Sequence, residues 1–129
     1  MKIAQVHHLA IICSDYERSK RFYCDALGLA VISETFRAER HSWKLDLALP
    51  GGLQIELFSF PNPPPRVSQP EACGLRHLAL AVENMDAEVS ALQASGIAVE
   101  AIRVDPVTGR RFTFFADPDG LPIELYDAS

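Results

Sequence analysis

The chain repeats itself: three short blocks in its first half recur, in the same order, 68 or 69 residues further on. The matched pairs are His8-Leu9-Ala10 with His77-Leu78-Ala79, Gly28-Leu29-Ala30-Val31 with Gly96-Ile97-Ala98-Val99, and Ile55-Glu56-Leu57 with Ile123-Glu124-Leu125. Self-similarity at a fixed spacing indicates two copies of one supersecondary unit. Because 129 residues is the usual size of one domain, each copy is a module of about half the chain.

The first module has the pattern of a βαβββ unit. A β-rich run over 6–13 leads into the helix N-cap signal Ser14-Asp15, and the amphipathic stretch that follows is expected to end at Gly28. Three strands are expected next, over 30–37, 43–49 and 53–60. Pro50-Gly51-Gly52 predicts the hairpin turn between the last two of these strands.

The second module reads the same way. A strand is expected over 75–82, and a helix begins at Asn84-Met85-Asp86 and ends at Gly96. The three remaining strands of this module, with the turn Asp117-Pro118-Asp119-Gly120 before the last, are expected over 98–104, 111–116 and 122–126.

Between the modules lies a segment with five prolines, which favours extended backbone over helix or central strand. We expect it to join the modules as a simple spacer, the alternative being that Phe60 and Arg66 line the rim of the site. The predicted organisation is a single domain, 1–129, with module 1 over about 4–60, the linker over about 61–73 and module 2 over about 74–127.

Composition excludes several classes of protein. With 48% hydrophobic residues the chain can bury a core, and its net charge of −5 provides no basic surface for nucleic acid. The cysteines, Cys13, Cys24 and Cys73, are odd in number and lack CxxC spacing, which fits reduced thiols. No apolar run has the length of a signal peptide core or a membrane span. We therefore expect a cytoplasmic protein that binds neither nucleic acid nor membrane.

Strand alternation separates the repeated histidines from the aliphatic residues beside them. In the first strand, Leu9 and Ile11 point to one face and His8 to the other, and the strand that follows His77 alternates in the same way. In the last strand of each module a glutamate lies on the face opposite to its flanking Ile and Leu. Because the covering helix packs on the aliphatic face, each histidine and glutamate should share the other face.

These four residues, His8, Glu56, His77 and Glu124, form the candidate site. A single strand histidine is most often a hydrogen-bonded or surface residue, and a single mid-strand glutamate is most often solvated. Their equivalent positions in two repeats favour a metal site instead, because imidazole and carboxylate suit divalent ions such as zinc, nickel, cobalt or iron.

The segments that carry these residues resemble a known family. They are HLAIICSD with His8, FYCDALGL over 22–29, IELF with Glu56, HLALAV with His77, and DPDGLPIEL over 117–125. Together they resemble the vicinal oxygen chelate (VOC) superfamily, also called glyoxalase/bleomycin resistance/dioxygenase, and within it the short bacterial glyoxalase I-like proteins of the YaeR type. The resemblance implies an α+β fold in which two βαβββ modules form a curled mixed sheet around one metal.

The ligand pattern distinguishes the chemistries of that superfamily. Two histidines with one glutamate are typical of extradiol dioxygenases and fosfomycin-resistance enzymes, whereas His, Glu, His, Glu is the glyoxalase I pattern. The resemblance therefore implies that His8, Glu56, His77 and Glu124 hold one divalent ion, with nickel, cobalt or zinc first and iron or manganese as further candidates. It also implies a small-molecule substrate and a homodimer.

The implied reaction is that of a glyoxalase I-like lyase. The ion holds neighbouring oxygens of a small 2-oxoaldehyde-derived substrate, and a carboxylate, Glu124 or Glu56, removes a carbon-bound proton to give an enediolate. Ile12 and Phe60 stand where bacterial glyoxalase I has an arginine and an asparagine that serve glutathione. A substrate without a peptide arm is therefore expected. The alternatives are an extradiol dioxygenase, a thiol or epoxide transferase, or a binding protein without catalysis.

The remaining polar and aromatic residues have simpler interpretations. Trp43, Phe112 and Phe114 are expected in the core, and Cys13 is expected as a small buried residue. Seven basic residues are candidates for meeting an anionic substrate, although solvation at the surface is the commoner fate of such side chains: Arg37, Arg40, Lys44, Arg66, Arg103, Arg110 and Arg111.

Overall fold

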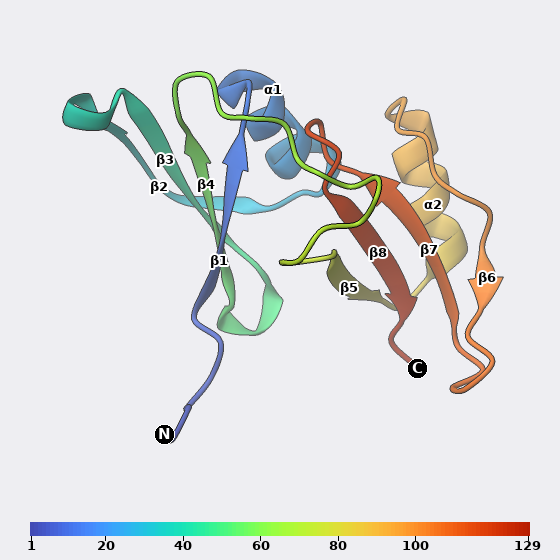
Figure 1. Cartoon of the computed structure of the whole chain (residues 1–129). Coiled ribbons are helices and arrows are strands. Elements are labelled where there is room, and N and C mark those ends of the chain that lie inside the picture. Colours follow the sequence, from blue (N-terminus) through green and yellow to red (C-terminus); the bar gives the residue numbers. More distant parts are fainter. The chain divides into compact units, whose positions relative to one another are not determined.

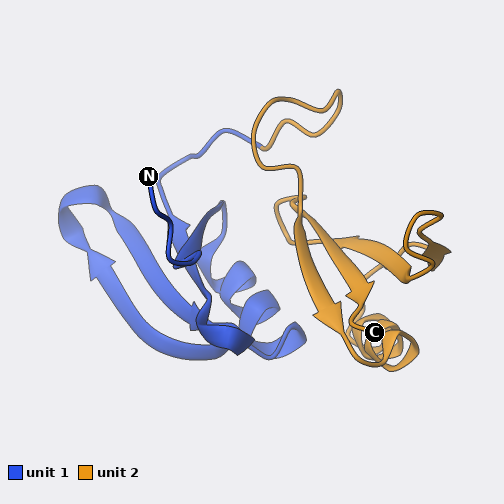
Figure 2. Ribbon diagram, turned by 90° about the horizontal axis from the view of Figure 1, so that it is seen from below, with its two compact units in different colours: residues 1–65 blue, residues 66–129 orange.

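Two units of the same topology make up the chain, Met1–Pro65 and Arg66–Ser129 (Figure 2). The computed structural model describes all 129 residues. Each unit folds in the order strand, helix and three strands, so the predicted pair of βαβββ modules is confirmed (Figure 1).

Unit 1 is a four-stranded mixed sheet with one helical segment. Its elements are β1 (His8–Cys13), α1 (Tyr16–Arg21) continued by a π-helical turn (Phe22–Ala26), β2 (Ala30–Arg37), β3 (Ser42–Ala48) and β4 (Gln54–Ser59), with short 3-10 turns at Ala38–Arg40 and Pro50–Gly52. The strand order is β1-β4-β3-β2. β1 runs parallel to β4 and the other neighbours are antiparallel, which places the first and last strands of the unit side by side.

Unit 2 repeats this sheet. Its elements are β5 (Leu78–Val82), α2 (Met85–Ala94), β6 (Arg103–Val104), β7 (Arg111–Ala116) and β8 (Pro122–Asp127). The order is β5-β8-β7-β6, with β5 parallel to β8. β6 is much shorter than the predicted strand over 98–104. Upstream of it the chain is tied to β7 by separate bonds, from Glu100 N to Phe114 O (2.9 Å) and from Thr113 Oγ1 to Glu100 O (2.8 Å), instead of by a continuous ladder.

Both helices begin where the sequence predicts. The Asp15 carboxylate accepts a hydrogen bond from Arg18 N, and the Asn84 side chain accepts one from Ala87 N, each at 3.1 Å. These bonds satisfy backbone donors that the first turn of a helix leaves without an acceptor. No helix of the structure combines the length and the apolar character needed to cross a bilayer.

One face of each sheet is buried and carries the aliphatic residues. Leu45, Leu47, Ile55 and Leu57 are fully buried in unit 1, and Ile123 is fully buried in unit 2. The helix of each unit packs on this face and buries its own side chains there, among them Tyr23, Met85, Val89 and Leu92. Cys13 is 1% exposed on the same face, as predicted. The opposite face of each sheet is left for the histidine and the glutamate.

Candidate functional site

The glutamate of each unit lies on the last strand, and the histidine lies at the start of the strand parallel to it: His8 is the first residue of β1 and His77 directly precedes β5. Glu56 on β4 is in register with Ala10 on β1, and Glu124 on β8 is in register with Ala79 on β5. Each alanine lies two residues after the histidine of its unit, so the histidine is on the same face and diagonally adjacent to the glutamate. The small alanine side chain leaves room for the two larger ones to meet.

The two side chains do meet in each unit. His8 Nε2 lies 3.6 Å from Glu56 Oε2, and His77 Nε2 lies 3.2 Å from Glu124 Oε2. The glutamate side chains are almost equally shielded, at 15% and 14% exposed. Two ligand atoms that each lie about 2.1 Å from one ion are roughly 3.0–3.4 Å apart at tetrahedral or octahedral angles. Each pair therefore has close to the spacing of two ligands to one ion.

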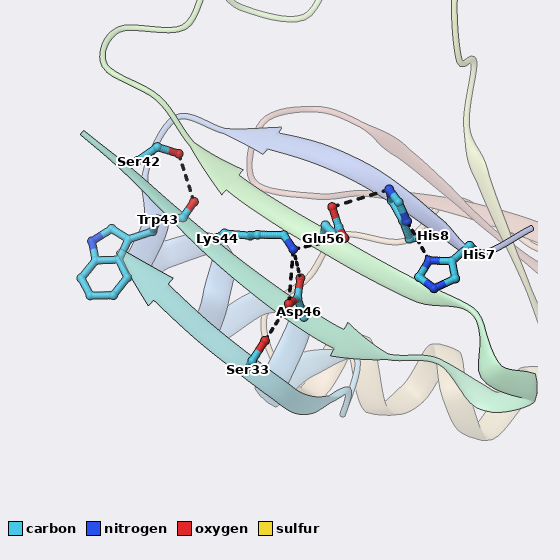
Figure 3. A network of polar contacts seen from close by, with 8 residues as sticks. All are labelled: His7, His8, Ser33, Ser42, Trp43, Lys44, Asp46 and Glu56. Carbon is cyan, nitrogen blue, oxygen red and sulfur yellow. Dashed lines mark hydrogen bonds and ion pairs between the residues drawn. The ribbon is translucent and has the colours of Figure 1, made fainter. Parts of the chain in front are cut away.

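The second nitrogen of each imidazole has a different environment in the two units. His8 Nδ1 is 2.9 Å from Nδ1 of the neighbouring His7 (Figure 3). His77 Nδ1 is buried without a hydrogen-bond partner, and its ring meets Phe114 edge-on, with the centroids 5.3 Å apart. A buried ring nitrogen without a partner is costly. The nitrogen that faces the glutamate is Nε2 in both units. The structure brings the candidate ligands together as these two pairs, and it contains no group of three or more histidine, cysteine, aspartate or glutamate side chains placed to hold a metal ion.

Charged side chains surround Glu56 in unit 1 (Figure 3). The Lys44 ammonium on β3 lies 3.3 Å from Glu56 Oε1 and 3.2 Å from Asp46 Oδ1, and Ser33 donates a 2.6 Å hydrogen bond to Asp46. Burial alone would raise the pKa of Asp46, but the bonds from Ser33 and Lys44 lower it below its usual value. Burial alone would lower the pKa of Lys44, and its two carboxylate partners raise it. Lys44 is thus a fixed cation between two carboxylates, and the candidate role of meeting an anionic substrate does not fit it.

Aromatic side chains occupy the corresponding places in unit 2. Phe114 on β7 is in register with Glu124, just as Asp46 on β3 is in register with Glu56. Phe112 and Phe114 meet edge to face, with centroids 6.2 Å apart. The prediction that both rings lie in the core is wrong, because they alternate with the buried Thr113 and therefore point to the other face of β7.

These two rings line a cavity of about 940 Å³ that is bounded wholly by residues of unit 2. His77 and Glu124 are also on its wall, and so is the proline-rich segment around Arg66. Arg66 donates hydrogen bonds from Nη2 to the carbonyls of Leu75 (2.7 Å) and Arg76 (2.9 Å). The linker is therefore more than the simple spacer that we expected, because its second part is folded back as one side of the cavity.

Apolar side chains lie beside the pair of unit 1, at the positions where the sequence departs from glyoxalase I. Ile12 is 54% exposed on the histidine-bearing face of β1. Phe60 stacks on Phe58, and the Arg37 guanidinium covers both rings, at 4.8 Å from the Phe58 centroid and 5.7 Å from that of Phe60. Arg37 also donates to Ser42 Oγ (3.0 Å), so it serves packing.

Two further residues have structural roles. Arg111 is held by Asp86 (2.9 Å) and Asp127 (3.1 Å), which raise its pKa. Trp43 stacks on Tyr16 with ring centroids 5.2 Å apart and stays partly exposed, so it is not the core residue that we expected. Arg40 and Arg110 are exposed.

Asp46 is the neighbour of the site that the sequence interpretation missed. It alternates with Leu45 and Leu47 in its strand, and this pattern places it on the face of Glu56. The alternation could have revealed it.

Two sheets of this topology in one chain, each with one histidine and one glutamate on the face opposite its aliphatic core, define a class of protein. The chain belongs to the glyoxalase/bleomycin resistance protein/dioxygenase superfamily, whose family model matches residues 5–125. The predicted fold class, α+β with two βαβββ modules, is confirmed by this match and by similar solved structures.

Within the superfamily the chain is similar to short bacterial proteins. It is 61% identical to the uncharacterized protein YaeR of Escherichia coli, over 97% of both chains. It is 60% identical to the uncharacterized protein YwkD of Bacillus subtilis, over 98% of this chain and 99% of that one. The crystal structure of SMU.1112c, 48% identical, superimposes with a TM-score of 0.93 over 97% of this chain and 99% of that chain.

Two more distant relatives have names that describe a function. A 2-epi-5-epi-valiolone epimerase from an Actinomyces species is 29% identical over 93% of this chain and 77% of its own length. TnmS3 from Streptomyces sp. CB03234, an antibiotic binding protein, is 28% identical and superimposes with a TM-score of 0.77 over 100% of this chain and 99% of that chain.

Proposed function

We propose that this protein is a metal-dependent, glyoxalase I-like lyase that acts on a small substrate with vicinal oxygens. The observation that carries the proposal is the repeated pair: each unit holds a histidine nitrogen 3.2–3.6 Å from a glutamate oxygen, at equivalent places on equivalent sheets. A chance surface histidine would not be matched in this way in both halves.

The proposed metal ligands are His8 and Glu56 from unit 1 with His77 and Glu124 from unit 2. Each unit supplies two of the four ligands, so the full set needs one unit 1 and one unit 2. These two units come from one chain or from the two chains of a homodimer. Nitrogen and oxygen donors of this kind suit nickel, cobalt or zinc, with iron or manganese as further candidates. When bound, the ion would stabilise the negative charge that develops on substrate oxygens during proton transfer.

Glu124 is the proposed base. It lies on the wall of the unit 2 cavity beside Phe114, where a substrate has access to it. The Glu56 carboxylate is instead engaged by the Lys44 ammonium, at 3.3 Å. In the proposed step Glu124 takes a proton from the carbon next to a carbonyl, and a proton is returned to the neighbouring carbon, so that the product is an isomer of the substrate.

The proposed substrate is a compact adduct of a 2-oxoaldehyde. Ile12 and the stacked pair of Phe58 and Phe60 form an apolar surface in unit 1, and the Arg37 guanidinium over the two rings is hydrogen-bonded to Ser42. A glutathione conjugate is therefore disfavoured relative to adducts of smaller thiols.

The direct test starts with metal analysis of the purified chain, followed by a screen of methylglyoxal hemithioacetals made with several thiols. We expect turnover that needs the metal, with deuterium entering the product from heavy water. Glu124→Gln and Glu56→Gln should each weaken metal binding, and Glu124→Gln should also abolish turnover and exchange when the variants are compared at equal metal content. Failure of the protein to retain any divalent metal after reconstitution would contradict the proposal.

Binding without catalysis is the second candidate function. The antibiotic-binding relative and the aromatic wall of the cavity support it. A ligand that binds tightly to metal-free protein and is recovered unchanged would favour this function.

Other chemistries of the superfamily separate by their co-substrates. The epimerase relative supports proton transfer, which a lyase and an epimerase share. Activity that stops when oxygen is removed would instead indicate a dioxygenase, and consumption of a thiol with an epoxide would indicate a transferase.

A further inference from the structure

One arginine lies against the aromatic wall of the unit 2 cavity. Arg103 on the edge strand β6 is in register with Phe112, so its side chain leaves the sheet on the same face as Glu124. Its guanidinium carbon is 4.9 Å from the centroid of Phe112 and 5.8 Å from that of Phe114. The same Phe114 ring touches His77, so a cation and a candidate metal ligand contact one aromatic ring.

The ion pair of Arg103 does not explain this position. Its Nη2 contacts Glu100 at 2.8 Å, but the two side chains are 54% and 59% exposed. Exposed pairs of this kind contribute little to stability. A guanidinium has five N–H donors in a planar fork, so one contact with a solvated carboxylate leaves others to offer. Stacking on the rings holds the plane of the fork in place.

The other two arginines of the cavity wall already have partners for their guanidinium groups. Arg66 holds the carbonyls of its own segment, and Arg76 is paired with Glu71 at 2.7 Å. The cavity wall carries three arginines and three glutamates, so its formal charge is balanced. A cavity wall without net charge favours a ligand with one negative charge over a phosphate dianion. The planar guanidinium of Arg103 matches the two oxygens of a carboxylate.

We propose that Arg103 is a specificity-determining residue that binds a carboxylate of the substrate. This inference rests on the proposed function, in which the vicinal oxygens of the substrate face His77 and Glu124. One planar group of the substrate, lying along Phe114, then separates these oxygens from the carboxylate that Arg103 binds. The substrate class is then a small acid whose carboxylate is separate from its reacting carbons.

The test uses two probes that differ only at the distal group. 4-Carboxymandelate has vicinal oxygens, a flat ring and a distal carboxylate, and 4-carbamoylmandelate replaces that carboxylate by a neutral amide. Both are titrated into the 15N-labelled 129-residue chain, with and without nickel, and the dissociation constants are measured by NMR. We expect the acid to bind about tenfold more tightly than the amide, as one charged hydrogen-bond pair would provide.

Three variants test whether Arg103 causes the preference for the acid. Arg103→Gln should remove the preference for the acid, whereas Glu100→Gln should increase it about threefold by removing a competing carboxylate. Arg110→Gln, an equal change of charge at an exposed arginine of the same unit, should leave it unchanged. Thermal unfolding of each variant verifies that it folds.

Equal binding of acid and amide, a preference that persists in Arg103→Gln, or no saturable binding of the acid would overturn the inference. Nickel binding is measured on the same samples. If nickel binds and the preference does not depend on Arg103, this inference alone fails. If nickel does not bind and the preference still depends on Arg103, the carboxylate site is supported and the proposed metal function fails.

Discussion

The two units have similar cores, but the sheet faces that carry the histidine and the glutamate differ between them. The residue in register with the glutamate is Asp46 in unit 1 and Phe114 in unit 2. Two residues earlier in the same strand the pair is Lys44 and Phe112. One glutamate is therefore embedded among charges, and the other lies beside aromatic rings and a cavity.

This difference indicates that the two units have different roles although they share one topology. The shared histidine and glutamate are what a metal would need from each unit. The neighbours that differ set what else each unit does. In unit 1 the Lys44 ammonium contacts both Glu56 and Asp46, and in unit 2 the two rings provide a surface on which a substrate can lie beside Glu124. Three variant pairs and one single variant test the comparison.

The largest effect is expected in the cores, where the units should behave alike. Ile55 and Ile123 occupy equivalent positions, and both are fully buried. Replacing either by alanine should lower the free energy of unfolding by about 2–5 kcal/mol, because the lost methyl groups leave a cavity. Urea denaturation followed by circular dichroism measures this. A cost below about 1 kcal/mol in one unit only would show that the two cores are not equivalent.

Loss of either histidine should weaken metal binding to a similar extent. Even partners that only orient a ligand change metal affinity by about 10- to 100-fold, so His8→Ala and His77→Ala should each exceed about 100-fold. Competition with a chromogenic chelator measures the affinity. His41→Ala is the matched control, because His41 is an exposed histidine that belongs to neither pair. A large loss for one histidine alone would assign the ion to a single unit.

Removal of the Lys44 charge should strengthen metal binding. Its ammonium is 3.3 Å from Glu56 and competes with a cation for that carboxylate. Lys44→Gln should tighten nickel binding on the order of tenfold, as expected when a positive charge about 4 Å away is removed. Arg110→Gln removes the same charge at an exposed position and should have no such effect. Weaker binding in Lys44→Gln would show that Lys44 positions Glu56 instead of competing for it.

The helix caps should give the smallest effect and again an equal one. Asp15→Ala and Asn84→Ala each remove one cap hydrogen bond, and each should cost about 1 kcal/mol of stability. Asp15→Asn and Asn84→Asp keep a capping oxygen and serve as controls. Thermal unfolding of the four variants makes the comparison, and a cost in one unit alone would indicate that only that helix contributes to the cooperative transition.

The sequence predicts most of the scaffold and part of the site, for reasons visible in particular residues. The strands over 30–37 and 111–116 lie as predicted, because apolar and β-branched runs between turn residues give a strong local signal. The strand over 98–104 is shorter, because its pairing depends on separate bonds to β7 that no local pattern encodes.

The surroundings of the glutamates are harder to predict. Phe112 and Phe114 look like core residues by composition, and only strand register shows that they share the face of Glu124. The path of the proline-rich segment is fixed by bonds from Arg66 to the carbonyls of Leu75 and Arg76, about ten residues away. Such contacts depend on tertiary structure and leave no periodic trace in the sequence.

The measurement that tests the central claim most directly is the stoichiometry of divalent metal bound to the purified chain and to two double variants. The account predicts one ion per chain in the wild type. It predicts none in either His8→Ala with Glu56→Gln or His77→Ala with Glu124→Gln. An ion retained by either double variant, or no ion in the wild type after reconstitution with nickel, cobalt and zinc, would contradict it.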